Sequence, residues 1–214
     1  MIAVYETVFR IGVYYMLIKT LPVGMLDTNC YIVTDEASQK CAIIDPGAES
    51  NTILDYVEEN KLTPLYIFLT HGHFDHYMAL NAVKDATGAP VFIHANDVGR
   101  RDEHKIEDGA RNLSKYADGD SFAIGELEIT VLETPGHSQG SVTLKCESAL
   151  FTGDTLFRDS CGRTDIGGDM QVLLRSLKRL SDLEGDYEVY PGHAGSTTLN
   201  RERSFNYFMV QANS

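Results

Sequence analysis

The chain has 214 residues, with 18 Lys and Arg against 31 Asp and Glu, which gives a formal net charge of −13 at pH 7. This length is typical of one domain and suffices to bury a core without support from disulfides or metals. The acidic excess repels the phosphates of nucleic acids and anionic lipids, so it argues against a nucleic-acid or membrane-surface function. We therefore expect a single domain over residues 1–214 that binds neither nucleic acid nor membrane.

The four cysteines, Cys30, Cys41, Cys146 and Cys161, lie far apart and form no C-x-x-C motif. This usage indicates free thiols in a reducing compartment rather than a disulfide framework. The longest uncharged stretch near the N-terminus, residues 11–18, is shorter than the ~20 apolar residues of a membrane span, and no small-residue cleavage site follows a basic start. These patterns predict a cytoplasmic protein.

The expected elements alternate short β-branched or aromatic runs with helical periods, which is typical of a layered α/β protein. In chain order, strands are expected at residues 14–20, 30–34, 41–45, 65–70 and 91–94, with helices at residues 50–59 and 76–87. Further strands are expected at residues 121–124, 127–133, 141–146, 149–152 and 188–190, with helices at residues 169–180 and 200–209. Residues 1–15 are a candidate N-terminal extension, and the polar, aperiodic residues 95–118 are a candidate lid or insertion.

Five of the seven histidines fall in three short motifs, and each motif follows a predicted strand. The motifs are Thr-His-Gly-His-Phe-Asp-His at residues 70–76, Thr-Pro-Gly-His-Ser around His137, and Tyr-Pro-Gly-His-Ala around His193. Loops at strand ends converge on one edge of a sheet, so these side chains are expected to meet. Together with two aspartates they give seven candidate metal ligands: His71, His73, Asp75, His76, His137, Asp154 and His193.

The residue types and their spacing indicate two metal ions. Gly72 permits a tight turn that aims His71 and His73 at one ion, whereas Asp75 and His76 are offset toward a second. Asp154 has two carboxylate oxygens and can bridge two cations about 3.5–4 Å apart. Imidazole and carboxylate donors suit Zn²⁺, Fe or Mn²⁺, and the lack of Cys among them argues against a closed structural zinc site.

The order H-x-H-x-D-H followed by a later His, Asp and His resembles the metallo-β-lactamase fold superfamily. The resemblance implies an α/β fold, a four-layer αβ/βα sandwich of two mixed β-sheets flanked by helices. It also implies two divalent metal ions, with zinc expected first and iron or manganese as alternatives. One ion would be held by His71, His73 and His137, the other by Asp75, His76 and His193, and Asp154 would bridge them.

Within that superfamily, residues 151–157 and 161–165 and the tail at residues 192–206 are similar to the glyoxalase II group. Because glyoxalase II proper has a further C-terminal helical domain, the resemblance is to its short, single-domain relatives. A basic residue at the position of Arg163 contacts the thioester substrate in that group, and a guanidinium fork suits a carboxylate. The competing interpretation of Arg163 is a salt bridge to Asp165 or Asp159.

The resemblance thus implies a hydrolase that cleaves a thioester, such as a hydroxyacylglutathione, with hydroxide supplied by the metals. Asp75 is the expected catalytic residue, which would orient water and hold one metal. Two alternatives stay open: a mononuclear Fe(II) persulfide dioxygenase that uses His71, His137 and Asp154, and a lactonase on the same scaffold. The acyl group, the thiol carrier, the native metal and the oligomeric state are left undetermined by the sequence. Neither His94 nor His104 belongs to a motif, so both are expected to be structural or solvated.

Overall fold

The computed structural model describes residues 5–11, 14–99 and 112–214. The candidate lid is therefore described only at residues 95–99 and 112–118, and His104 lies outside the described residues. Among the helices in these ranges, none has the length and apolar character that crossing a membrane requires.

Two mixed β-sheets form the centre of the fold. The first contains β1 (Tyr5–Ile11), β2 (Tyr14–Val23), β3 (Thr28–Asp35), β4 (Lys40–Ile44), β5 (Thr63–Phe68), β6 (Val91–His94) and β7 (Leu113–Tyr116), in that order. Strands β1 to β4 pair antiparallel and β4 to β7 pair parallel. Every residue of β3 is buried, as expected for a strand covered on both faces.

The second sheet has the order β15-β14-β11-β10-β9-β8. Its strands are β8 (Ser121–Ile124), β9 (Leu127–Glu133), β10 (Val142–Cys146), β11 (Ala149–Gly153), β14 (Glu188–Pro191) and β15 (Thr197–Thr198). A small ribbon of β12 (Leu156–Phe157) and β13 (Ser160–Cys161) lies beside it. The β11–β14 pair is parallel and its neighbours are antiparallel, so this sheet is mixed as well.

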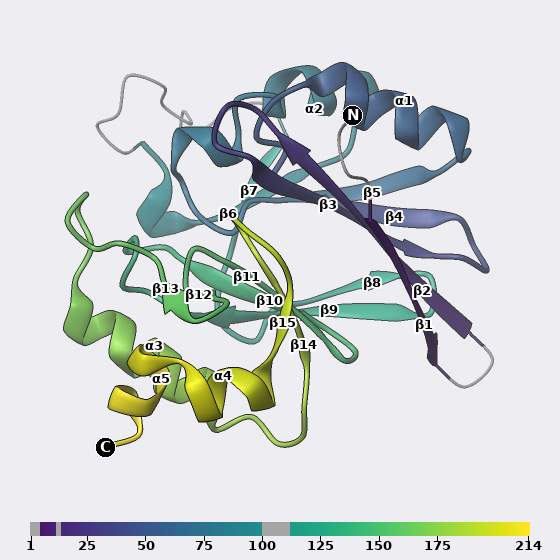
Figure 1. The fold of residues 1–214 in the computed structure, drawn as a ribbon. Helices are drawn as coiled ribbons and strands as arrows, with labels where there is room; N and C mark the ends of the chain where they lie inside the picture. The colour runs from purple at the N-terminus through teal and green to yellow at the C-terminus, as the bar shows by residue number, and fades with distance from the viewer. Residues whose placement is uncertain (1–4, 12–13, 100–111) are drawn as a thin grey trace.

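Helices cover the outer face of each sheet (Figure 1). They are α1 (Ser50–Glu59), α2 (Leu80–Thr87), α3 (Met170–Ser181), α4 (Leu199–Phe205) and α5 (Tyr207–Ala212), with 3-10 turns η1 (Phe74–His76) and η2 (Ala95–Asp97). α1 and α2 pack on the first sheet, and α3 to α5 pack on the second, each through a buried apolar cluster. A third cluster, which includes Phe68 and Phe151, fills the space between the sheets. This arrangement confirms the predicted four-layer sandwich.

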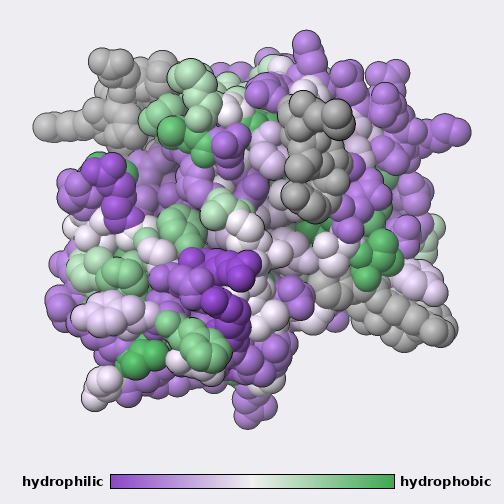
Figure 2. Space-filling model, in the orientation of Figure 1, coloured by the Kyte–Doolittle hydropathy of each residue, from purple (hydrophilic) through white to green (hydrophobic). Residues whose placement is uncertain are grey.

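The surface agrees with the acidic composition. The face shown in Figure 2 is largely hydrophilic, with smaller hydrophobic groups scattered among hydrophilic residues. The exposed apolar residues include Phe205, Tyr207 and Val210 near the C-terminus and Met25 and Leu26 in the turn between β2 and β3.

The element boundaries differ from the predictions at several places. Residues 76–87 do not form one helix, because His76 closes a 3-10 turn by donating its N–H to the His73 carbonyl, and α2 begins only at Leu80. The expected helix at residues 200–209 is two helices, since Asn206 has an extended ψ of 117° and its side chain caps α5. Residues assigned to the candidate extension and to the candidate lid form β1 and β7.

Candidate metal centre

All seven predicted ligand residues meet at one edge of the sandwich, where loops from both sheets converge. The first sheet contributes His71 and His73 after β5 and Asp75 and His76 in η1. The second contributes His137 from the β9–β10 loop, Asp154 after β11 and His193 after β14. The residues are far apart in sequence, so this cluster depends on the packing of the two sheets.

The donor atoms fall into overlapping groups of three. His71, His73 and His137 form one group, and Asp75, His76 and His193 form another, with all donor atoms of each group within 4.8 Å of one another. These are the same sets that the resemblance assigned to two separate metals. His71, His76 and Asp154 form a third group that joins the other two.

Asp154 faces both groups. Its Oδ1 lies 3.5 Å from Nε2 of His76, and its Oδ2 lies 3.5 Å from Nε2 of His137 and 3.7 Å from Nε2 of His193. Two ligands of a tetrahedral metal with bonds of about 2.1 Å stand about 3.4 Å apart, so this spacing fits a shared cation. Nε2 of His76 and Oδ1 of Asp154 are buried, and neither atom has a hydrogen-bond partner among the described residues. Because buried polar atoms are normally paired, a bound divalent metal fits here.

The charges of the site also favour a cation. Burial raises the pKa of Asp154, but His76, His137 and His193 outweigh that effect and lower it. Burial likewise raises the pKa of Asp75, yet its contacts with His193 and His76 bring the pKa well below the ordinary value. Both aspartates are therefore carboxylates at neutral pH, as metal ligands must be.

Asp45, at the end of β4, orients His76. Its Oδ2 lies 2.9 Å from Nδ1 of His76 and accepts a hydrogen bond of 2.6 Å from Oγ1 of Thr70, while Oδ1 accepts one of 2.7 Å from the Thr70 N–H. With Nδ1 directed at Asp45, Nε2 faces the other donors, and it offers them a lone pair once a metal displaces its proton. Burial lowers the pKa of His76, but the carboxylates of Asp45 and Asp154 raise it well above its usual value.

Asp45 was not among the predicted site residues, because its Asp-Pro-Gly sequence indicated only a turn. Its φ of 51° is uncommon outside glycine and is a feature of the folded chain that a short motif does not reveal. A buried aspartate with such a backbone angle beside a ligand is the structural signal of a supporting role.

Backbone carbonyls orient two further rings. Nδ1 of His137 lies 2.7 Å from the Arg163 carbonyl oxygen, and Nδ1 of His193 lies 3.0 Å from that of Leu26. Thr28 Oγ1 donates to Oδ2 of Asp75 at 3.0 Å. Such contacts fix the ring nitrogens and carboxylate oxygens that face a metal.

Glycines allow the ligand loops to approach closely. A Cβ on Gly192 would stand 2.3 Å from Oδ1 of Asp154 and 2.7 Å from Cε1 of His76. A Cβ on Gly162 would stand 1.9 Å from the Asp154 carbonyl oxygen. The glycines of the Pro-Gly-His and Cys-Gly-Arg sequences are thus packed against the site.

The side chain of Arg163 pairs with Asp165, as the competing interpretation expected. Its Nε and Nη2 donate to the two carboxylate oxygens at 2.6 and 2.5 Å, and both side chains are exposed. Cys161 is buried, and burial raises its pKa to about 11, so the thiol stays protonated at neutral pH. All four cysteines are free and buried, which confirms the predicted free thiols.

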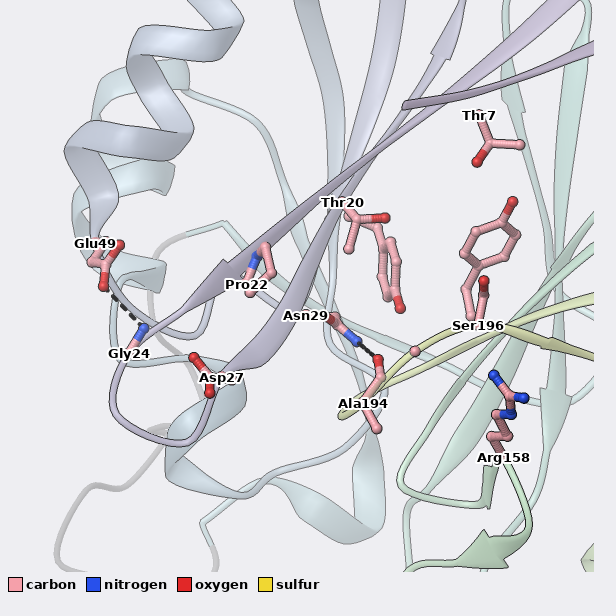
Figure 3. Close-up of a pocket in the computed structure, with 13 residues that line it drawn as sticks. Thr7, Thr20, Pro22, Gly24, Asp27, Asn29, Glu49, Arg158, Ala194 and Ser196 are labelled. Carbon is pink, nitrogen blue, oxygen red and sulfur yellow. Dashed lines mark hydrogen bonds between the residues drawn. The ribbon is translucent and has the colours of Figure 1, made fainter. Parts of the chain in front are cut away.

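A cavity of about 770 Å³ adjoins the loop that carries His193 (Figure 3). Its walls come from β1 and β2 on one side, including Thr7 and Thr20, and from Ala194 and Ser196 on the other. Asn29 closes the wall by donating from Nδ2 to the carbonyl oxygens of Pro191 and Ala194 at 3.0 and 2.9 Å. A volume of this size can hold a small organic molecule.

Comparison with known proteins agrees with the superfamily resemblance of the ligand motifs. The family model described as "Metallo-beta-lactamase superfamily" matches residues 23–193. The chain is 37% identical to an uncharacterized protein of Mycobacterium leprae over 91% of this chain and 99% of that protein. It is 36% identical to the "Probable metallo-hydrolase YqgX" of Bacillus subtilis over 89% of this chain and 96% of that protein.

The chain is also similar to several solved structures. The chain is similar to BLEG-1 B3 metallo-beta-lactamase, with a TM-score of 0.80, 34% identity and coverage of 90% of this chain and 99% of that one. ETHE1 from Myxococcus xanthus gives a TM-score of 0.79, 30% identity and coverage of 92% and 90%. TTHA1623, solved in a di-iron-bound form, gives a TM-score of 0.76, 34% identity and coverage of 88% and 98%.

Proposed function

Because the chain belongs to the metallo-beta-lactamase superfamily, we propose that it is a metal-dependent hydrolase that cleaves a thioester with two divalent ions, zinc foremost. The observation that carries the proposal is the position of Asp154, whose two oxygens face two three-residue donor groups at 3.5 Å. A hydrolase with a single metal would need only one of these groups.

In this proposal His71, His73 and His137 hold one ion, Asp75, His76 and His193 hold the other, and Asp154 contacts both. Two ions bound there would lower the pKa of a water molecule toward neutrality and polarise the carbonyl group of a substrate. Asp75 is the proposed catalytic residue, because Thr28 and His193 hold its Oδ2 in place at 3.0 and 3.2 Å while its other oxygen can accept a hydrogen bond from water.

A thioester suits the chemistry of this site. A thiol has an ordinary pKa near 8.5, so a thiolate leaves without much help from a general acid. Two features near the ligands could serve substrate binding: Arg163, whose backbone carbonyl contacts the His137 ring, and the cavity that Ala194 lines next to His193 in the chain. Arg163 would bind a carboxylate of the thiol carrier after exchanging its partner Asp165, which costs little because that ion pair is exposed.

The proposal is tested by measuring thiol release from S-lactoylglutathione and from simpler thioesters after loading the protein separately with Zn²⁺, Mn²⁺ and Fe²⁺. A lactone is included in the panel to test the lactonase alternative. We expect turnover of a thioester by the loaded protein and its loss in Asp154→Ala. Full activity of that variant, or hydrolysis of the lactone alone, would refute the proposal.

A second candidate function is an iron-dependent oxygenase that acts on a persulfide. His71, His76 and Asp154 lie within 4.8 Å, and two histidines with one carboxylate are the ligands that non-haem Fe(II) oxygenases use. His137, expected in that set from the sequence, has Nε2 at 3.5 Å from Asp154. The similar structure of TTHA1623 contains two irons, which supports including iron in the assay. Oxygen uptake with glutathione persulfide, without thioester cleavage, would favour this candidate.

A further inference from the structure

A second buried carboxylate, Asp97, joins two of the ligand loops. Asp97 ends the turn η2 and is only 1% exposed. Its Oδ2 accepts hydrogen bonds from the Gly72 N–H at 2.8 Å and from Oγ of Ser138 at 2.6 Å, and its Oδ1 accepts one from the Gly140 N–H at 2.9 Å. Gly72 separates His71 from His73, and Ser138 follows the next ligand of the same group along the chain.

The packing around Asp97 is as specific as its hydrogen bonds. A Cβ on Gly72 would stand 2.7 Å from the Asp97 carbonyl oxygen and 3.0 Å from its Cβ. A Cβ on Gly140 would stand 2.8 Å from Cγ of Asp97. Both loops therefore carry glycine where they meet this side chain, and each presents a backbone N–H to it. Ser138 adds a hydroxyl that is further held by Oγ of Ser141 at 2.7 Å.

We propose that Asp97 is a positioning residue that fixes the distance between the His71–His73 turn and the His137 loop, and thereby sets the affinity of the first donor group for its metal. The inference rests on the two-metal site of the proposed function. Asp97 is bonded to the backbone of one loop and to the backbone and a side chain of the other, so losing its charge lets the two loops separate.

The second donor group has a different support. Asp45 contacts the ring of His76 directly, at 2.9 Å from Oδ2 to Nδ1, whereas its link to the first group runs through Thr70, whose Oγ1 lies 3.1 Å from Nδ1 of His71. Loss of the Asp97 carboxylate should therefore lower the affinity for one of the two metal ions and leave the affinity for the other nearly unchanged. A general loss of stability would lower the affinity for both ions.

Asp35 provides a matched control. It is also fully buried, and its Oδ2 accepts hydrogen bonds from Ser38 Oγ at 2.5 Å and from the N–H groups of Ser38 and Glu126 at 3.3 and 3.4 Å. It lies at the far end of β3 from Thr28, which contacts Asp75. The two residues are seven positions apart along the strand, or about 23 Å. The Asp35→Asn change thus perturbs a similar carboxylate remote from the metal centre.

The experiment measures Zn²⁺ binding to the full chain and to the Asp97→Asn and Asp35→Asn variants by competition with a chromophoric chelator. The visible absorption of Co²⁺-loaded protein reports the ligand geometry of each equivalent, and urea unfolding of metal-free protein reports stability. We expect Asp97→Asn to lose 10–100-fold in affinity for one equivalent and to change its Co²⁺ spectrum. Asp35→Asn should bind both zinc ions with the affinity of the parent, and its metal-free form should unfold at a lower urea concentration.

If Asp97→Asn does not fold, Ser138→Ala removes one donor and keeps the carboxylate, and it should weaken the same equivalent by a smaller factor. Parent-like binding of both equivalents in Asp97→Asn or Ser138→Ala, or an equal loss for both equivalents, would overturn the proposal. These measurements need no substrate. If the parent protein binds two metal ions but cleaves no thioester, the proposed function is refuted, and the metal affinities of the variants still decide whether Asp97 is a positioning residue. A parent that binds a single metal would overturn both.

Discussion

Replacing Asp45 by asparagine tests how the site controls the ring of His76. The change keeps the size of the side chain but removes a negative charge and replaces one acceptor oxygen by an NH₂ group. Oδ2 accepts from Thr70 Oγ1 at 2.6 Å and lies 2.9 Å from Nδ1 of His76, whereas Oδ1 accepts from the Thr70 N–H. The amide oxygen can keep the backbone hydrogen bond, so two hydrogen bonds to a charged acceptor are lost.

Hydrogen bonds to charged groups contribute about 1.5–3 kcal/mol each, so the metal-free Asp45→Asn variant should be less stable by about 3–6 kcal/mol. The new NH₂ group also faces an N–H of His76, which favours the other tautomer and puts a hydrogen on the nitrogen that faces Asp154. Zinc affinity should therefore fall by about 10–100-fold.

The assay combines urea unfolding of the metal-free protein with a zinc competition titration. Thr70→Ser is the matched control, since it retains the hydroxyl that donates to Asp45. A loss of less than about 1 kcal/mol together with parent-like zinc affinity would show that Asp45 does not orient the ring.

Three further predictions concern the same site and one helix. Gly192→Ala should abolish tight metal binding, because its Cβ would stand 2.3 Å from Oδ1 of Asp154. Apart from its chain neighbours, a Cβ on Gly195 would meet no atom of the described residues within 4 Å, so Gly195→Ala should bind metal as the parent does in the same titration. Asp169→Ala should lower the free energy of unfolding by about 1 kcal/mol, because the Asp169 side chain caps α3 by accepting hydrogen bonds from the N–H groups of Gln171 and Val172. Unchanged stability in urea would contradict this prediction. Removing metal with a chelator should lower the melting temperature, and zinc at about 100 times its dissociation constant should raise the free energy of unfolding by about 2.7 kcal/mol per site. A melting temperature that neither the chelator nor zinc changes would count against a bound metal.

The sequence was enough to find the candidate ligands because they lie in short motifs after strands. His71, His73 and His76 can be recognised from seven consecutive residues, and the packing of the two sheets then brings the distant His137 and His193 to the same place. The strand and helix patterns predicted a layered α/β protein, and the four-layer architecture was implied by the resemblance that the same ligand motifs carry.

Supporting residues were not predictable in this way. Asp97 and its partners Gly72 and Ser138 are 25 and 41 residues apart in the chain, so no local pattern indicates their contact. β7 was assigned to a candidate insertion because residues 95–118 are polar and show no steady period, although its backbone pairs with β6. The division between α4 and α5 depends on Asn206, whose side chain caps the second helix and also donates to the Phe157 and Ser160 carbonyl oxygens.

The division of the ligands between the two sheets bears on when a metal can be bound during synthesis. Four of the seven candidate ligands precede residue 77, and three follow residue 136. Synthesis proceeds from the N-terminus, so the early histidines emerge long before His193 and can hold an ion only weakly until the second sheet has packed. Tight metal binding would then mark the docking of the two halves, and a metal-loaded protein would unfold as one cooperative unit.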